Sequence, residues 1–234
     1  MSHNLPVPQE SKSQINKAGK ALVAAKLFSQ DYEDALELAN RWRACHAYPI
    51  NTFQATLRTK INSCKGDVLV AQRLKRMPTI IDKLSRFPNM QLTTMQDIAG
   101  IRAIFDDLSD IDFIVSKYVG NKNFPHEFVG SNDYILNPRD IDGYRSHHLV
   151  YKYRNKQKPM YDGLRVEIQL RTKLQHIWAT AVETMGTFLG QALKSKQGEK
   201  EWLDFFALVS SAFSFLEKTP QVPRFLHLSR EQTL

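Results

Sequence analysis

LRVEIQLR, residues 164–171, is the stretch of sequence that decides the fold. Apolar and polar residues alternate through it, which is the pattern of a β-strand with one buried face. Arg165, Glu167, Gln169 and Arg171 then share the opposite face. That polar face either contacts solvent, as in many one-faced sheets, or carries a site, and this strand alone leaves both interpretations open.

Similar alternations predict the rest of a sheet around this strand. Strands are expected over 68–72, 100–105 and 147–153, and helical periodicity predicts helices over 79–86, 111–118, 173–191 and 199–216. We therefore expect an α+β fold, a mixed β-sheet flanked by helices. Loops are expected over 120–138 and 155–163, and the tail from Pro220 is expected to be mobile.

The pattern of apolar and polar residues changes near residue 66. Before it the pattern is helical, with Ser29 as an N-cap and Pro49 in the first turn of a helix. The expected organisation is an N-terminal helical segment packed on the core (1–65), a catalytic core (66–192), and a C-terminal helix and tail (193–234).

Two acidic residues are candidate metal ligands. Asp97 precedes the predicted strand that begins at Gly100, and Glu167 lies on the polar face of 164–171. If these strands are neighbours, the two carboxylates can converge to bind Mg²⁺ together with substrate phosphates. Alternatively, Asp97 caps a turn.

Positive charge concentrates in one part of the chain. The 234 residues carry a net charge of +8, and the segment 58–86 alone holds eight cations against two acids. Such a run is either a solvated face or a binding site for polyphosphate or nucleic acid. Lys83 and Arg86 share a helix face, and Arg73 and Lys75 share a face if that segment is extended.

A turn-rich segment, 133–148, leads into the third predicted strand. The Gly143-Tyr144 step can expose an aromatic ring for stacking on a nucleobase, although tyrosines beside strands also pack within sheets. His147 and His148 point to opposite faces and lack HExxH spacing, so zinc is not expected. One of the two histidines is expected to be structural.

Several function classes lack their sequence signals. The chain contains no GxxxxGK[ST], GxGxxG or GxSxG motif, and its two cysteines show neither metal spacing nor local activation. It shows no secretory signal, and its longest apolar stretch, 205–216, is shorter than the ~20 residues of a membrane span. We expect a cytoplasmic protein with no membrane partner.

Four segments, in this order, resemble the synthetase domain of the RelA/SpoT family, which includes the small alarmone synthetases: RLKRMPTIIDKLSR, DIAGIRAIF, DYILNPRDIDGYRSHHLVY and VEIQLRTKLQHIWATAVE. The similarity extends over 68–183. It implies a sheet of the nucleotidyltransferase type and Mg²⁺-dependent transfer of the ATP β,γ-pyrophosphate to the 3′-hydroxyl of GDP or GTP, which makes (p)ppGpp.

The resemblance also assigns roles residue by residue. Asp97 and Glu167 match the metal-binding acids, and Glu167 also assists deprotonation of the acceptor hydroxyl. On the ATP side, Arg73 and Arg102 flank the adenine, whereas Lys75, Lys83 and Arg86 contact the phosphates. On the acceptor side, Tyr144 stacks on the guanine, with His148, Arg139 and Gln169 beside it.

Some residues depart from the family pattern. His147 stands where leucine is usual, Asp142 where asparagine is common, and Arg139 in place of a lysine. These departures bear on the identity of the acceptor more than on the chemistry. The hydrolase domain of long family members and its His-Asp motif are missing from this sequence, so no alarmone hydrolysis is expected.

Other functions remain open at this point. A toxin that pyrophosphorylates the 3′ end of tRNA would use the basic run and a second basic segment, 145–158. Adenosine nucleotides are another possible acceptor, and a catalytically silent nucleotide-binding module is a third alternative. The apolar helix 199–216 is either buried in the domain or contacts a partner, which would be a second subunit or an antitoxin.

Overall fold

The computed structural model describes residues 5–121, 123–191, 193 and 198–233. Three N-terminal helices precede the sheet, whose first two strands alternate with helices, and three helices follow its last strand. The elements are α1 (Lys12–Ala24), α2 (Gln30–Cys45), α3 (Ala47–Ile61), β1 (Leu69–Leu74), α4 (Met77–Arg86), β2 (Ala99–Phe105), α5 (Leu108–Tyr118), β3 (Glu127–Asp133), β4 (His147–Lys152), β5 (Arg165–Thr172), α6 (Lys173–Phe188), α7 (Lys200–Glu217) and α8 (Arg230–Thr233).

The strands form one five-stranded sheet in the order β1-β2-β5-β4-β3. β2 and β5 are parallel, and the other neighbouring strands are antiparallel. The expected mixed sheet flanked by helices is therefore confirmed. β5, the strand of the opening sequence, lies at its centre.

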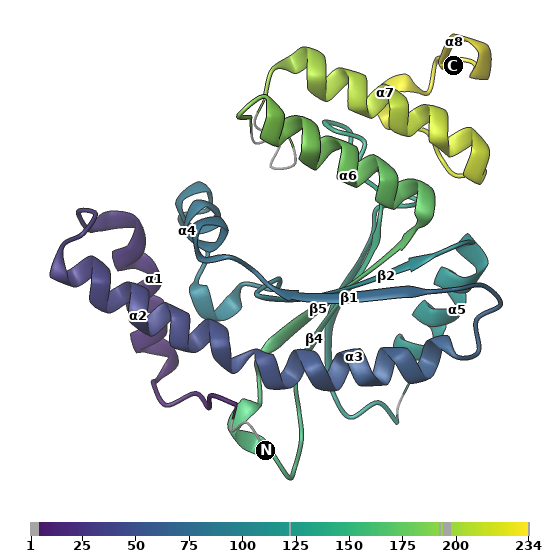
Figure 1. Cartoon of the computed structure of the whole chain (residues 1–234). Helices are drawn as coiled ribbons and strands as arrows, with labels where there is room; N and C mark the ends of the chain where they lie inside the picture. Colours follow the sequence, from purple (N-terminus) through teal and green to yellow (C-terminus); the bar gives the residue numbers. More distant parts are fainter. Residues whose placement is uncertain (1–4, 122, 192, 194–197, 234) are drawn as a thin grey trace.

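One face of the sheet is the core. Ile101, Leu149 and Ile168, on three neighbouring strands, are all almost fully buried there. Figure 1 shows α3 and α5 along this face, whereas α4, α6 and α7 lie on the other side. The helices of the N-terminal segment supply apolar residues such as Ile15 and Phe53 to the same core.

The other face carries polar side chains in register across the strands. Arg102 on β2 pairs with Gln169 on β5, Gln169 with His148 on β4, and His148 with Asn132 on β3. Because residues opposite one another in a ladder share a face, these four side chains form a row. Arg73, Gly100 and Glu167 form the neighbouring row.

Local capping signals set the start of two helices. The Ser29 hydroxyl accepts a hydrogen bond from the Tyr32 amide, as expected for the N-cap of α2. Thr172, the last residue of β5, forms a capping box with Gln175 and starts α6 with no intervening loop. The central strand thus leads directly into the helix above the polar face.

The expected loop over 120–138 is wrong in part, because it contains the strand β3. This strand lies at the edge of the sheet, is mostly exposed or half-buried, and has a bulge between Phe128 and Gly130. An edge strand with neither face fully buried lacks the apolar alternation that marks strands in a sequence. Smaller differences are that β1 extends to Leu74 and that α6 ends at Phe188.

The tail, which was expected to be mobile, packs against the rest of the protein at its start. Val222 is fully buried, and its amide donates to the Ser211 hydroxyl of α7. Arg145 is buried as well and donates to the Ser210 hydroxyl and to the carbonyl oxygens of Ile135 and Pro220. The tail and α7 are therefore fixed to the turn that precedes β4.

No helix in the described parts of the chain is both long and apolar enough to span a bilayer.

Truncating the centre of the core tests this fold. Ile168 on β5 is fully buried, whereas Ile177 on α6 has an exposed fraction of 59%. We expect Ile168→Ala to lower the free energy of unfolding by about 2–5 kcal/mol because it leaves a cavity. The matched substitution Ile177→Ala should change it by less than about 0.5 kcal/mol. Urea denaturation measures both, and equal losses would contradict the assigned core.

Candidate functional site

The polar face of the sheet forms the floor of a cleft of about 510 Å³. A smaller cavity of about 180 Å³ adjoins it, sharing Arg73, Asp97 and Glu167. The structure brings the residues singled out from the sequence together: all except Arg102 line the larger cleft, and Arg102 lines the smaller cavity. Those in the larger cleft are Arg73, Lys75, Lys83, Arg86, Asp97, Arg139, Tyr144, His148, Glu167 and Gln169.

Asp97 lies two residues before β2 and is held by two lysines. Lys75, just after β1, and Lys83, on α4, each place Nζ 2.9 Å from one of its carboxylate oxygens. Burial of Asp97 favours the neutral acid, but Lys83 and Lys75 outweigh it and lower its pKa to about 2. The carboxylate is thus ionised at neutral pH, and the cations that hold it come from two elements of the basic run.

Glu167, on β5, has different partners. His148 Nδ1 lies 3.2 Å from its Oε1, and Gln169 Nε2 donates to its Oε2 at 2.6 Å. Burial raises the pKa of Glu167 and nearby Asp97 adds to this, but the contact with His148 outweighs both, so the pKa is below its ordinary value. Both acids of the cleft are therefore ionised.

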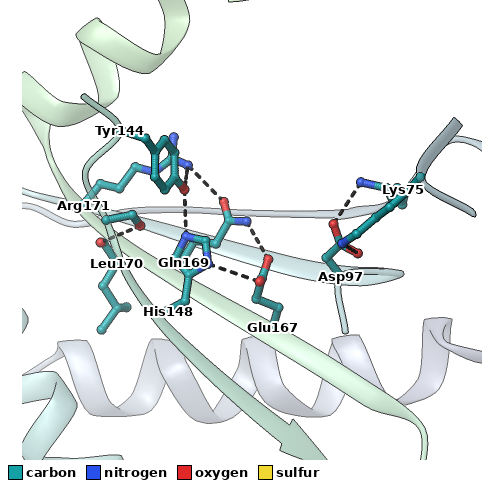
Figure 2. A network of polar contacts seen from close by, with 10 residues as sticks. Lys75, Asp97, Tyr144, His148, Glu167, Gln169, Leu170 and Arg171 are labelled. Carbon is teal, nitrogen blue, oxygen red and sulfur yellow. Dashed lines mark hydrogen bonds and ion pairs between the residues drawn. The ribbon is translucent and has the colours of Figure 1, made fainter. Parts of the chain in front are cut away.

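Five side chains form a closed ring of hydrogen bonds, shown on the left of Figure 2. The Tyr144 hydroxyl lies 2.7 Å from His148 Nε2, His148 Nδ1 contacts Glu167, and Glu167 accepts from Gln169. Arg171 closes the ring, because its Nη2 donates to both the Tyr144 hydroxyl and Gln169 Oε1. Lys75 and Asp97 lie beside this ring, on the right of Figure 2.

Of the two interpretations of Tyr144, an exposed ring or a packed one, the structure shows a packed ring. Its exposed fraction is 6%, and it packs with Trp178, Val182 and Phe206 in a second apolar cluster. This cluster is built mainly from α6 and α7, which lie far along the chain from Tyr144. The ring nevertheless borders the cleft, where the Arg139 guanidinium lies 4.2 Å from its centroid.

The remaining cations lie on two sides of the cleft. Arg86 on α4 lines the larger cleft, while Arg73 and Arg102 border the smaller cavity around Gly100. A Cβ built on Gly100 would meet only the Arg73 carbonyl oxygen, at 3.9 Å. The absence of a side chain at Gly100 therefore leaves room between the two arginines and the acids.

Arg171 and Glu183 are among the cleft residues that were given no role from the sequence. Arg171 was expected on the polar face of β5 but was given no role, and Glu183 of α6 lines both cavities. The two-residue period that selected Glu167 and Gln169 also reaches Arg171. Glu183 had no such signal, because its position depends on how α6 crosses the sheet.

The other sequence expectations concern residues around the cleft. His147 faces away from it, and its Nε2 lies 2.7 Å from the Ser131 hydroxyl, in keeping with a structural histidine. Burial raises the pKa of both cysteine thiols, that of Cys45 to about 11, so neither is activated.

The second basic segment, 145–158, has five cations, of which Lys156 and Lys158 are exposed and three are buried or paired with an acid. Arg145 is buried inside the protein, and Lys152 and Arg154 both pair with Glu127.

The two acids provide a donor set of hard oxygen ligands. Among the described residues no group of three or more His, Cys, Asp or Glu side chains could hold a metal ion by itself. Mg²⁺, however, is commonly bound by one or two carboxylates together with substrate phosphates and water. Asp97 and Glu167, both ionised and both lining the same cavities, fit that mode of binding.

A family model matches the part of the chain that builds this cleft. Residues 72–186 match the model described as "Region found in RelA / SpoT proteins". The chain carries a RelA/SpoT domain. Its matched region begins in β1 and ends in α6, so it includes every cleft residue discussed above.

Curated relatives of this RelA/SpoT domain occur in Bacillus subtilis. The chain is 35% identical over 113 residues to GTP pyrophosphokinase YjbM, covering 47% of this chain and 52% of the relative. It is 32% identical over 114 residues to GTP pyrophosphokinase YwaC, covering 46% and 52%. The chain thus spans about half the length of the curated relatives it matches.

Solved structures share the fold of the RelA/SpoT domain. Small alarmone synthetase 1 from Bacillus subtilis, bound to its product pppGpp, matches with a TM-score of 0.65 and 24% identity over 78% of this chain and 94% of that one. Small alarmone synthetase 2 from the same organism matches with a TM-score of 0.59 and 23% identity, covering 81% and 95%. Both likenesses cover a larger share of the chain than the family model matches.

The hydrogen-bonded ring predicts an unusual titration of Tyr144. Burial opposes ionisation of its phenol, but Arg171 and His148 outweigh burial and lower the pKa to about 8. Burial raises the pKa of Tyr118 and Tyr151, so their titrations do not overlap with it. We expect a phenolate absorbance change near pH 8 that is absent in Tyr144→Phe.

The sign of the stability effect follows from the lowered pKa. The folded state loses the Tyr144 proton near pH 8, whereas the unfolded chain retains it to about pH 10. This group therefore adds stability as the pH rises from 8 to 10. If the phenolate absorbance change near pH 8 persists in Tyr144→Phe, the assignment of the lowered pKa to Tyr144 is contradicted.

Proposed function

We propose that this protein transfers the β,γ-pyrophosphate of ATP to the 3′-hydroxyl of GDP or GTP, with Mg²⁺ as cofactor. The observation that carries this proposal is the meeting of two ionised carboxylates, Asp97 and Glu167, with the cations of the basic run in one cleft. The names of the curated relatives YjbM and YwaC support the same reaction class. ATP and guanosine nucleotides are cytoplasmic, and we propose that the reaction takes place there.

The donor half of the cleft suits ATP. Arg73 and Arg102 border the small cavity around Gly100, which has the open space that the adenine ring needs. Lys75, Lys83 and Arg86 lie at the adjoining end of the larger cleft, where they can bind the phosphates. Cations placed around a transferring phosphoryl group stabilise the charge that develops on it.

The acceptor half contains the proton acceptor. In the proposed reaction the 3′-oxygen bonds to the β-phosphorus, the bond from that phosphorus to the oxygen bridging to the α-phosphate breaks, and AMP leaves. The hydroxyl proton goes to Glu167, which is ionised and held in place by His148 and Gln169. Mg²⁺ bound by Asp97 and Glu167 would neutralise charge on the phosphates.

Substitution of the two acids tests this assignment. We expect Asp97→Asn and Glu167→Gln each to lower the rate of transfer on the order of 10²–10³-fold or more, because each removes a charge from the reacting centre. Asp31→Asn and Glu33→Gln, which make the same changes at exposed positions of α2, serve as matched controls. Circular dichroism checks that all four variants fold.

The assay offers each acceptor separately. Purified protein, Mg²⁺ and γ-³²P-labelled ATP are incubated with GDP, GTP, adenosine nucleotides or bulk tRNA. Label on GDP or GTP supports the proposal. Label only on tRNA or only on adenosine nucleotides would show that the acceptor is not a guanosine nucleotide. If no acceptor is labelled, the interpretation that remains is a nucleotide-binding module without catalytic activity.

Filling the small cavity tests where ATP binds. Gly100→Val places a side chain in open space on a strand that favours β-branched residues, so we expect unchanged thermal stability. The KM for ATP should rise several-fold while the KM for the acceptor changes little. Gly130→Val is the matched control, because a Cβ there also meets nothing within 4 Å and Gly130 lines neither cavity. An unaltered KM for ATP would place the adenine elsewhere.

A further inference from the structure

Arg139 covers the ring of Tyr144 and is held there by Asp142. The Arg139 guanidinium lies 4.2 Å from the ring centroid. Its Nε donates to Asp142 Oδ1 at 3.1 Å, and its Nη2 donates to Asp142 Oδ2 at 2.5 Å. Such a two-point contact fixes both the position and the plane of the guanidinium. The two departures from the family pattern in this turn are therefore partners of one another.

The backbone of the turn is held in place, so the Arg139 side chain, and not the turn, is the part that can move off the Tyr144 ring. The Gly143 amide donates to the Arg139 carbonyl at 2.8 Å, and the Gly143 carbonyl accepts from the Ser210 hydroxyl of α7 at 2.6 Å. Gly143 has a φ of +74°, and a Cβ there would lie 2.8 Å from the Ala207 Cα. The turn is packed against α7 too closely to move without disturbing that helix.

Two guanidinium groups lie over the Tyr144 ring, and that of Arg139 is the one that can move away. Arg171 also lies over Tyr144, at 5.0 Å from the centroid, but its exposed fraction is 1% and the hydrogen-bonded ring holds it. The Arg139 side chain, by contrast, has an exposed fraction of 24% and borders the cleft. An aromatic base stacks with its centroid about 4.5 Å or more from a ring, and a guanidinium at 4.2 Å occupies that space.

We propose that Asp142 is a positioning residue that, through Arg139, sets the affinity for the acceptor. By holding Arg139 over Tyr144, it makes the acceptor base displace this guanidinium before it can stack on the ring. The displaced Arg139 remains in the cleft as a cation for the acceptor's phosphates. This inference rests on the proposed function, because it takes Tyr144 as the surface on which the acceptor base stacks.

Asp142→Asn separates the hold on Arg139 from the structure of the turn. Asparagine keeps an oxygen that can accept from the Tyr144 amide, as Asp142 Oδ1 does at 3.1 Å, but it loses the charge that pairs with Arg139. We expect the KM for GDP to fall about fivefold, an effect at the upper end for a partly exposed ion pair, with the KM for ATP unchanged. Asp31→Asn, which loses the same charge on α2, should alter neither value. An unchanged KM for GDP in Asp142→Asn would overturn the proposal.

A second measurement follows Arg139 without any reaction. In ¹⁵N-labelled protein the Arg139 Nε–H signal, identified by its loss in Arg139→Lys, should be shifted by the Tyr144 ring. We expect GDP to remove this shift in the wild-type protein, and Asp142→Asn to reduce it without nucleotide. Calorimetric binding of GDP that leaves the Arg139 signal unmoved would overturn the proposal.

The two measurements also distinguish this inference from the proposed function. If the Arg139 signal responds to GDP but no acceptor is labelled, the proposed reaction is contradicted. The displacement of Arg139 from the Tyr144 ring by the acceptor is still supported. If GDP is labelled but its KM is the same in the wild type and in Asp142→Asn, the reaction is supported and the proposed role of Asp142 is contradicted.

Discussion

β5 lies at the centre of the sheet, hydrogen-bonded to β2 on one side and to β4 on the other, and its register sets where the charged groups of the cleft stand. Glu167 is opposite Gly100, and Gln169 is opposite both Arg102 and His148. A shift of one residue would turn Glu167 into the apolar core and Ile168 into the cleft. The buried face thus specifies the polar face, because burial of Val166, Ile168 and Leu170 turns the residues between them toward the cleft.

The cleft balances its charges in two separate ways. Asp97 is neutralised by Lys75 and Lys83, whereas Glu167 is stabilised by His148 and Gln169. Side chains that hold one another before a ligand arrives need little rearrangement when it binds. The division also separates the half of the cleft rich in cations from the half rich in aromatic and amide groups, which matches the different needs of a polyphosphate and a nucleoside.

The polar face could be predicted from sequence because a strand has a strict two-residue period, and the same period brings Glu167, Gln169 and Arg171 to one side. The strand β3 could not, because an edge strand has no fully buried face to leave an apolar pattern. The burial of Tyr144 depends on Trp178 and Phe206, which are 34 or more positions away, and no local pattern records that contact. The pairing of Arg139 with Asp142 was equally hidden, because a turn has no period that places two side chains together.

These contacts give α7 a part in the cleft that its sequence did not indicate. The apolar helix was expected either to be buried in the domain or to contact a partner, and the structure shows two different faces. The inner face holds Ser210, which accepts from Arg145 and donates to the Gly143 carbonyl, so it fixes the turn that carries Tyr144. The outer face leaves Phe205 and Leu216 exposed. Because the inner face sets the position of Tyr144, any change that moves α7 also moves the ring that borders the cleft, and the acceptor half depends on this helix as the donor half depends on α4.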